Sequence, residues 1–367
     1  MYFYTPTFEP VGGVVKTFDY VTHALALGYS VTICCPERFS RQFPLFQLPR
    51  FRNIPSSSKV RFKKPWRVRI DTTDLVFFSW PKDFELIEPR MAHGTVYDQV
   101  IHIIQSIRHV SPSFMKGYAR RLLSRPLSRI MINEIVHDAC NPYLNRSSLV
   151  AVIPLGHYVD FFGQKRHGGL PRPIKVGYTT WKSDFGDRLV NHLRDETELF
   201  TFYAIRNQVD WNQLREFYQR VDVFLATPLA EEGFYLPGLE AMAAGALVIS
   251  SDAGGNRAYC RFGDNCVYAE FENINSYADA LRGIASQNPT EIAAMRNHAY
   301  QTLDRHRLSK ERDLFAEFLR KLASRIDNQA FYPRFPTNNS LSETAPSGEA
   351  LKEAWRRCVR VFRARRF

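Results

Sequence analysis

The 367-residue sequence lacks the features that mark several common classes of protein. Its six cysteines form no CxxC pair, so neither zinc-ligand spacing nor a disulfide scaffold is indicated. No apolar run approaches the roughly 18–20 residues needed to span a bilayer. The N-terminus shows neither the basic region nor the apolar stretch of a signal peptide. We therefore expect a cytoplasmic protein with reduced thiols.

Several nucleotide- and metal-binding motifs are also missing. The sequence has no P-loop, no GxSxG and no GxGxxG followed about 20 residues later by the acid that binds the ribose of NAD. It contains no Asp-x-Asp pair of the kind that chelates a metal–diphosphate complex. We therefore predict no cofactor and no metal site.

What the sequence does have is an uneven excess of basic residues. The net charge is +12. Between Glu37 and Asp71 there are ten Lys or Arg residues and no acid, and between Asp98 and Glu134 there are six and no acid. Such clusters attract phosphate-bearing partners, although a solvated basic face explains any single run equally well.

Residues 1–155 alternate between strand-like and helix-like stretches and are expected to form the N-terminal domain. A short aromatic strand over 1–5 is followed by Gly12-Gly13, an apolar helical pattern over 14–27 and a buried-type strand over 31–35. Further strands are expected at 74–79, 100–105, 130–133 and 149–154, and a helix at 113–127. This pattern indicates a parallel, Rossmann-like α/β sheet.

A second alternating series begins after a Gly-, His- and Pro-rich joint at 156–172 and runs over 173–326. Strands are expected at 174–178, 199–204, 222–226 and 246–250, with helices at 187–194, 211–220, 237–244, 276–286 and 308–326. The fold class is therefore α/β with two Rossmann-like domains facing each other. Residues 331–350 are expected to be a flexible linker, and 351–367 a basic amphipathic tail.

The most informative stretch is Thr227–Gly245, which follows an expected strand and enters a helix. Pro237 suits the first helical turn, and the free N–H groups at a helix start favour an anion. Two carboxylates, Glu232 and Glu240, flank this turn. Because ionised carboxylates accept hydrogen bonds well, the pair suits an anionic ligand that also presents sugar hydroxyls.

Glu232 and Glu240, in the string Glu-Gly-Phe-x-Leu-Pro-x-Leu-Glu-Ala-Met-Ala-x-Gly, resemble the donor-site motif of the Glu-x7-Glu group of retaining GT-B glycosyltransferases (family 4-like). The following residues 246–255 and 261–267 and the N-terminal Gly12-Gly13-Val14 agree with that family in the same order. The resemblance implies a GT-B fold of two Rossmann-like domains over residues 1 to about 325.

The resemblance also implies roles for individual residues. Glu240 would bind the ribose of a nucleotide-sugar, and Glu232 would contact hydroxyls of the transferred sugar. Backbone N–H groups near Phe234, Tyr235 and Leu236 would face the sugar and the diphosphate. Gly12 and Gly13 would form the opposing loop.

Two departures from the family pattern concern charge and acid–base chemistry. Lys182 fits the phosphate-binding Lys, but Tyr178 occupies the usual Arg position, and Arg257 or Lys16 are the alternatives for the missing charge. The strand over 100–105 ends in Gln105 instead of the usual His. His109, just beyond it, is therefore a candidate catalytic residue beside Glu232 and Lys182, with a surface role as the alternative.

These observations predict a metal-independent hexosyltransferase that moves a sugar from a nucleoside diphosphate sugar to a hydroxyl of a glycan or lipid-linked acceptor, with retention of configuration. Alternatives are a non-catalytic basic protein that binds membranes or nucleic acid, or a GT-B-like sugar-nucleotide epimerase. Basic and apolar residues in 113–130 and 351–367 suggest helices at an anionic membrane surface. We therefore expect a polysaccharide or cell-envelope enzyme, possible peripheral membrane contact and no nucleic-acid partner.

Overall fold

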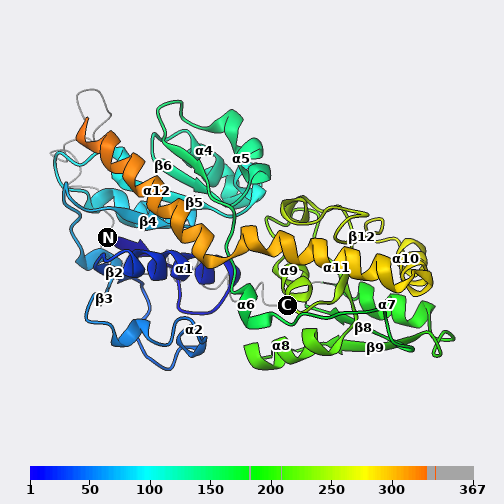
Figure 1. The fold of residues 1–367 in the computed structure, drawn as a ribbon. Helices are drawn as coiled ribbons and strands as arrows, with labels where there is room; N and C mark the ends of the chain where they lie inside the picture. Colours follow the sequence, from blue (N-terminus) through cyan, green and yellow to red (C-terminus); the bar gives the residue numbers. More distant parts are fainter. Residues whose placement is uncertain (182, 208, 329–334, 336–367) are drawn as a thin grey trace. The chain divides into compact units, whose positions relative to one another are not determined.

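The structure is a computed structural model that describes residues 1–181, 183–207, 209–328 and 335. The chain forms two compact units. Unit 1 consists of Met1–Ile153 together with the chain from Arg312 onward, and unit 2 is the continuous segment Pro154–Glu311. Each unit contains its own parallel sheet (Figure 1).

Unit 1 is built on a seven-stranded parallel sheet in the order β3-β2-β1-β4-β5-β6-β7. Its strands are β1 (Tyr2–Tyr4), β2 (Val31–Cys34), β3 (Val60–Lys63), β4 (Val76–Phe78), β5 (Val100–Ile104), β6 (Ser128–Met131) and β7 (Val150–Val152). In the centre, Phe3 of β1 lies level with Ile33 of β2 and Phe77 of β4. All three side chains are buried, as expected for a sheet covered on both faces.

The helices of unit 1 are short apart from the first and the last. They are α1 (Gly12–Ala26), α2 (Pro44–Gln47), α3 (Phe84–Ile87), α4 (Tyr118–Leu123), α5 (Glu134–Cys140) and α12 (Leu308–Asp327). Single 3-10 turns are η1 (Ile54–Ser56), η2 (Pro65–Arg67), η3 (Pro81–Asp83), η4 (Glu88–Arg90), η5 (Tyr97–Gln99), η6 (Ile107–Val110), η7 (Phe114–Gly117) and η8 (Asn141–Tyr143). Phe315 of α12 packs against Tyr20 and Phe77, with ring centroids 5.1 and 5.6 Å away. Most of α12 therefore groups with unit 1, although the sequence pattern placed it with the second domain.

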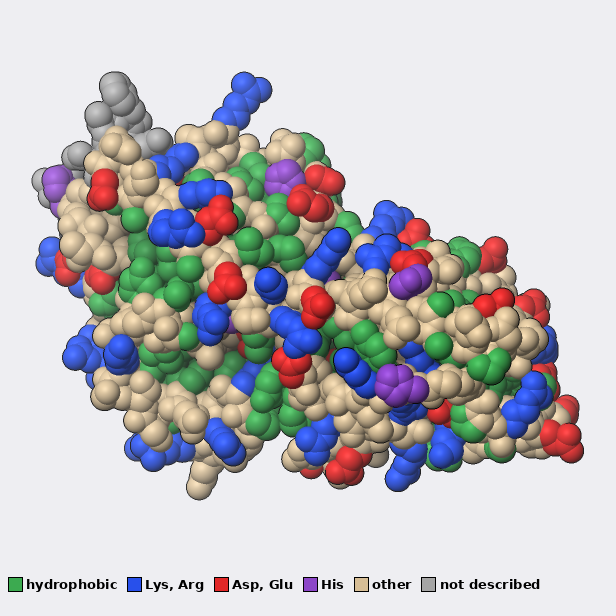
Figure 2. Space-filling model, viewed as in Figure 1, with side chains coloured by type: hydrophobic (Ala, Val, Ile, Leu, Met, Phe, Trp, Pro, Cys, Tyr) green, Lys and Arg blue, Asp and Glu red, His purple; other side chains and the backbone are tan. Residues whose placement is uncertain are grey.

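The edge strand β3 separates apolar from basic side chains. Phe62 turns inward and stacks on Phe39 with ring centroids 3.8 Å apart. Arg61 and Lys63, on the opposite side of the pleat, are exposed. Figure 2 shows basic side chains over this part of unit 1, near β3 and α2. Around β3 the basic run is therefore a solvated surface over a buried aromatic cluster, whereas Arg50 of the same run is buried in an ion pair with Asp19 at 2.9 Å.

Unit 2 is built on a five-stranded parallel sheet in the order β12-β11-β10-β8-β9. Its strands are β8 (Ile174–Thr179), β9 (Phe200–Ile205), β10 (Val223–Ala226), β11 (Leu247–Ser250) and β12 (Val267–Tyr268). The helices are α6 (Val159–Phe162), α7 (Phe185–His192), α8 (Trp211–Arg220), α9 (Leu236–Ala243), α10 (Ile274–Ser286) and α11 (Pro289–Leu303), with 3-10 turns η9 (Gly254–Ala258) and η10 (Asp304–His306). The strand order reverses between β8 and β10, and ligands of such sheets bind where the carboxyl ends of those strands diverge.

One sequence prediction about unit 1 is wrong. The expected basic helix over 113–130 does not form, because Met115 and Lys116 adopt left-handed backbone angles, with φ of 51° and 52°. Only Tyr118–Leu123 is α-helical, and Leu122 and Leu123 are buried. Arg129 lies in β6 and is fully buried. This segment therefore offers no amphipathic helix to a membrane.

Two further expectations concern membrane-spanning helices and the C-terminal residues. Among the described residues, no helix combines the length and the apolar character required to cross a bilayer. The expected tail over 351–367, and the expected linker over 331–350 apart from Phe335, lie outside the described residues.

Candidate functional site

The Glu-x7-Glu segment lies at the carboxyl edge of the sheet in unit 2. It leaves β10 at Ala226 and enters α9, which begins at Leu236 with Pro237 in its first turn. Tyr235 caps this helix without a side-chain hydrogen bond. Pro237 has no N–H, and the Gly238 N–H bonds the Tyr235 carbonyl at 3.3 Å. The helix start still carries the partial positive charge that suits an anion.

The loop before α9 is held by the turn that follows β11. An added Cβ on Gly255 would lie 2.6 Å from the Phe234 nitrogen and 2.7 Å from the Glu232 carbonyl oxygen. Only glycine therefore allows this turn to support the loop at such a short distance. The turn at Gly255 and the loop at Glu232–Phe234 are therefore in direct contact.

Tyr259 fixes the start of α9 from the same side. Its hydroxyl donates a 2.7 Å hydrogen bond to the Tyr235 carbonyl and lies over Gly238, where an added Cβ would be 2.4 Å from that oxygen. The Tyr235 side chain is itself buried between Thr179 and Thr227, and burial raises its pKa to about 12. Tyr235 therefore has no side-chain atom for a ligand, and it can offer only its backbone.

Glu240 lies one turn inside α9 and is 5 % exposed. Its Oε1 is 2.8 Å from Nε2 of His157, a residue that is only 2 % exposed. Burial, and then the charge of Glu240, raise the pKa of the Tyr218 phenol well above its usual range. The carboxylate is thus held by His157 in the interior of unit 2.

Glu232 occupies a different environment. It is half-buried in the loop before α9, and its backbone N–H bonds the Leu229 carbonyl at 3.0 Å. Burial raises the pKa values of the neighbouring phenols of Tyr235 and Tyr259, and the charge of Glu232 adds to both shifts. The two glutamates therefore share the same helix start but differ in burial.

Tyr178, which occupies the expected arginine position, lies beside Arg206 at the end of the neighbouring strand. Its hydroxyl donates a 2.6 Å hydrogen bond to Asp187, and Arg206 pairs with both oxygens of Asp187 at 2.6 and 2.7 Å. Arg206 follows β9 immediately, and its Nη2 is 3.4 Å from the Tyr178 hydroxyl. Sequence reasoning missed Arg206, because only the pairing of β8 with β9 brings it to this edge.

The other basic candidates are already paired or lie elsewhere. Arg257 makes two hydrogen bonds to Asp252, at 2.7 and 2.9 Å. Lys16 belongs to unit 1, where its ammonium is 2.9 Å from Asp19 and its side chain is 4 % exposed. Lys182 lies outside the described residues. Among the alternatives for the missing charge, the geometry favours neither Arg257 nor Lys16.

The predicted glycine loop lies in unit 1. Gly12 and Gly13 are exposed and form the first turn of α1, whose cap, Val11, makes no side-chain hydrogen bond. Gln105, at the end of β5, donates a 3.1 Å hydrogen bond to the Gly13 carbonyl. The residue that replaces the expected histidine thus contacts the glycine loop directly.

His109 is not at a surface, so the prediction that it is catalytic is not supported. It is 5 % exposed, its Nδ1 lies 2.9 Å from the Ser106 carbonyl, and its ring lies against His102 and Phe114. Burial lowers its pKa to about 4. Its contacts with His102 and Phe114 are those of a side chain in the core of unit 1, so we leave it out of the proposed site.

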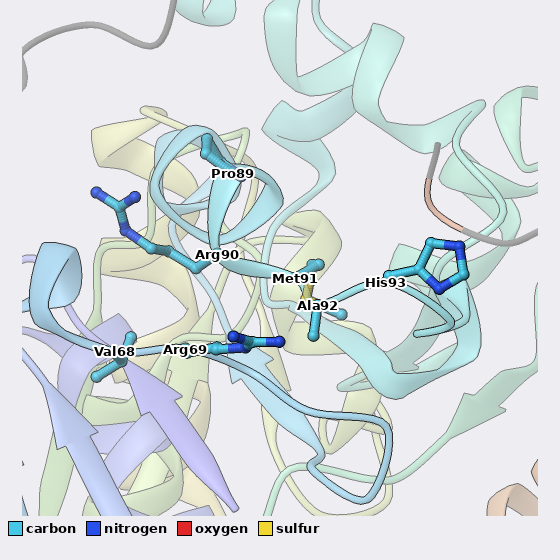
Figure 3. A pocket seen from close by; sticks show the side chains of 7 residues that line it. All are labelled: Val68, Arg69, Pro89, Arg90, Met91, Ala92 and His93. Carbon is cyan, nitrogen blue, oxygen red and sulfur yellow. The ribbon is translucent and has the colours of Figure 1, made fainter. Parts of the chain in front are cut away.

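A separate, open pocket with a volume of about 370 Å³ lies in unit 1 (Figure 3). Arg69, Arg90 and His93 line it, but the ends of their side chains point in different directions. In the part of the chain that the structure describes, one group has metal-like ligand geometry: Glu134, His137 and Asp138 on α5. Both carboxylates are exposed. Neither place resembles a ligand site.

The comparisons with known proteins agree with this geometry. Residues 185–287, which include both glutamates, match the family model described as "Glycosyl transferases group 1". A search of curated proteins finds no match.

Solved structures match over nearly the whole chain at low sequence identity. Anabaena Alr3699/HepE in complex with UDP is 14% identical with a TM-score of 0.63, covering 87% of this chain and 99% of that one. Sucrose-phosphate synthase from Thermosynechococcus elongatus is 15% identical with a TM-score of 0.59, covering 88% and 99%. A glycosyltransferase from Rickettsia africae is 12% identical with a TM-score of 0.60, covering 88% and 98%.

At these identities the solved structures establish only the fold. The match to the family model is what indicates the activity. The predicted GT-B architecture is confirmed, with two units that each carry a parallel Rossmann-like sheet. The match over 185–287 confirms the resemblance to the glycosyltransferases and the prediction of a sugar-transferring enzyme.

Proposed function

We propose that this enzyme transfers a hexosyl group from a nucleoside diphosphate sugar to a hydroxyl of a glycan or lipid-linked acceptor, with retention of configuration and without a metal. The observation that carries the proposal is the geometry around α9. A carboxylate, Glu240, is held inside unit 2 one turn behind a helix start that has no side-chain cap. This arrangement can bind hydroxyls and a diphosphate of the same ligand.

The donor would be held by groups along this edge of the sheet. Glu240 would accept hydrogen bonds from the ribose hydroxyls, and Glu232 from hydroxyls of the sugar. The backbone N–H groups near Phe234, Tyr235 and Leu236 would face the diphosphate, together with Lys182. The resemblance also assigns a loop role to Gly12 and Gly13 of unit 1, which stays a prediction.

The chemistry would depend on stabilising the leaving group. As the glycosidic bond breaks, negative charge grows on the diphosphate, and the helix start and Lys182 would stabilise that charge without a metal. The acceptor hydroxyl would attack from the leaving-group face, with a phosphate oxygen taking its proton. No residue of the proposed site is a metal ligand in this scheme, and no cofactor takes part.

The proposal for the acceptor rests on the distribution of basic residues. The exposed basic surface around β3 and the basic segment 351–367 suit an anionic environment, such as a membrane that holds a lipid-linked acceptor. Because the 113–130 segment forms no amphipathic helix, such docking would depend on the tail. Removing 351–367 would then abolish salt-sensitive retention on vesicles of anionic lipid, while equal retention by the truncated and full chains would contradict a role for the tail.

The experiment that tests the proposal has two stages. A thermal-shift screen of UDP, GDP, ADP and dTDP with their common sugars identifies the donor, and neighbouring folds solved with UDP make UDP and UDP-glucose the first probes. Transfer to a panel of glycan and lipid-linked acceptors is then followed with the best donor, and the anomeric configuration of the product is determined. Stabilisation followed by a retained product supports the proposal. A free epimerised sugar nucleotide, or no nucleotide binding at all, would contradict it.

A further inference from the structure

The strongest unassigned feature is the contact between the donor motif and the two chain segments at the ends of unit 2. His157 lies near the start of this unit, and His306 lies near its end. The His157 backbone N–H bonds the His306 carbonyl at 2.7 Å, and His306 Nδ1 is 2.8 Å from the Leu155 carbonyl. The two segments therefore run side by side and fix each other.

The histidine of each segment also contacts a residue of the donor motif. His306 packs against Phe234 and Tyr259, with ring centroids 5.3 and 6.4 Å apart. His157 reaches Glu240 at 2.8 Å, and the two side chains are only 2 % and 7 % exposed. Neither histidine belongs to the Glu-x7-Glu string, and the His157 contact joins residues 83 positions apart.

The His157 ring has little freedom to leave this position. It stacks on Phe162, with centroids 5.8 Å apart and planes 16° apart, and it also contacts Trp211 at 5.9 Å. Its backbone is fixed by the bridge to Arg307. When the carboxylate is ionised it only accepts hydrogen bonds, and Nε2 of His157 is then the donor.

We propose that His157 is a positioning residue for donor binding: its Nε2–H holds Oε1 of Glu240 so that the remaining lone pairs of the carboxylate face the ribose hydroxyls. This inference rests on the proposed function, because it assigns His157 to the ribose contact of Glu240. Without such a donor, the desolvation cost of the buried carboxylate would not be compensated, and its rotamer would no longer be fixed. His157 itself does not touch the substrate.

The experiment measures binding of the nucleoside diphosphate that stabilises the wild-type protein most, and of its 2′,3′-dideoxy analogue, by calorimetry. His157→Phe keeps the ring and removes the donor, whereas His157→Gln keeps a donor. Phe161→Leu, in the same aromatic cluster with centroids 5.8 Å from Trp211, is the packing control.

If His157 acts through the ribose contact, His157→Phe weakens the ribonucleotide by about tenfold or more and the dideoxy analogue by less than about twofold. His157→Gln recovers most of the loss, and Phe161→Leu does not discriminate between the two nucleotides. In steady-state assays the KM for the donor rises while kcat changes little. Adding His157→Phe to Glu240→Gln produces little further loss, because the pair acts as a unit.

Equal weakening of both nucleotides by His157→Phe would overturn the inference, since it would indicate a general packing defect. Unchanged affinity for the ribonucleotide in a folded variant would overturn it too. His157→Asn, whose shorter amide does not reach Glu240, replaces the Phe variant if that variant does not fold. A wild-type protein that binds no nucleotide would instead contradict the proposed function, so the two failures are distinguishable.

Discussion

The hydroxyl of Tyr259 donates a 2.7 Å hydrogen bond to the backbone carbonyl of Tyr235. To reach that carbonyl, the hydroxyl lies directly over the one residue of α9 that has no Cβ. That position is Gly238. The helix start that would face the diphosphate is thereby fixed by a side chain from the turn after β11.

Gly238→Ala should destabilise the fold by about 1–3 kcal/mol, because its Cβ would meet the Tyr259 hydroxyl at 2.4 Å. Tyr259→Phe alone should cost about 1 kcal/mol for the lost hydrogen bond. The double variant should be more stable than the sum of the two effects predicts, since removing the hydroxyl relieves the clash. Urea denaturation of all four proteins measures this coupling, and strict additivity would show that the clash is relieved in another way.

Glu240→Gln should weaken binding of the nucleoside diphosphate and of the intact donor together, by about 1.5–3 kcal/mol, because a charged acceptor is replaced by a neutral amide. Calorimetry with both ligands checks the effect. Glu198→Gln, an exposed position in unit 2, is the control and should bind normally. A folded Glu240→Gln protein with wild-type affinity would disprove the ribose assignment.

Lys182→Ala should lower kcat more than it lowers affinity for the nucleoside, because the ammonium would stabilise charge that grows in the transition state. The comparison uses turnover with the donor and binding of the nucleoside with and without its diphosphate. Arg206→Gln, measured in parallel, shows whether the guanidinium beside Tyr178 acts on the same phosphates. Equal losses for nucleoside and nucleoside diphosphate in Lys182→Ala would argue against a phosphate contact.

Transfer should persist in excess EDTA, because in the proposed scheme the helix start and Lys182 stabilise the diphosphate. The measurement is the initial rate with and without chelator, followed by addition of magnesium or manganese. A rate that disappears with EDTA and returns with either ion would require a different account of the donor site.

His109→Phe should retain transfer activity and should flatten the pH dependence of stability. The folded pKa of His109, about 4, lies below its ordinary value of 6.5, so the unfolded chain binds the extra proton between these values. The free energy of unfolding therefore falls as pH decreases from about 6.5 towards 4, by up to ~1.4 kcal/mol per pH unit for this group. Denaturant titrations at pH 7 and pH 5 measure the slope, with the exposed His192→Ala as control. An unchanged slope in His109→Phe would contradict the burial argument.

Local patterns predicted most of the architecture. The helix over 211–220 has the bounds expected from its apolar spacing, and the segment from β10 to β11 follows the predicted order of strand, loop, helix and strand. β12, with two residues, is too short to leave a pattern, and the helix over Pro289–Leu303 has apolar and polar residues too evenly mixed for its periodicity to be visible.

The site was predictable only where its residues are contiguous. Glu232 and Glu240 are close in sequence, so a single string reveals them. His157 and Arg206 acquire their partners through tertiary contacts, across 83 and 19 positions. The burial of His109 likewise depends on Phe114 and the strands beside it, which no local pattern reveals.

The edge strand β3 has a consequence for how the protein behaves among its own copies. An unpaired strand offers N–H and C=O groups to any extended chain, and such edges promote aggregation. Here the edge is only four residues long, its apolar Phe62 is committed to stacking on Phe39, and Arg61 and Lys63 project outward. A second molecule that approached edge to edge would bring like charges together, so the chain is protected against sheet extension at this end.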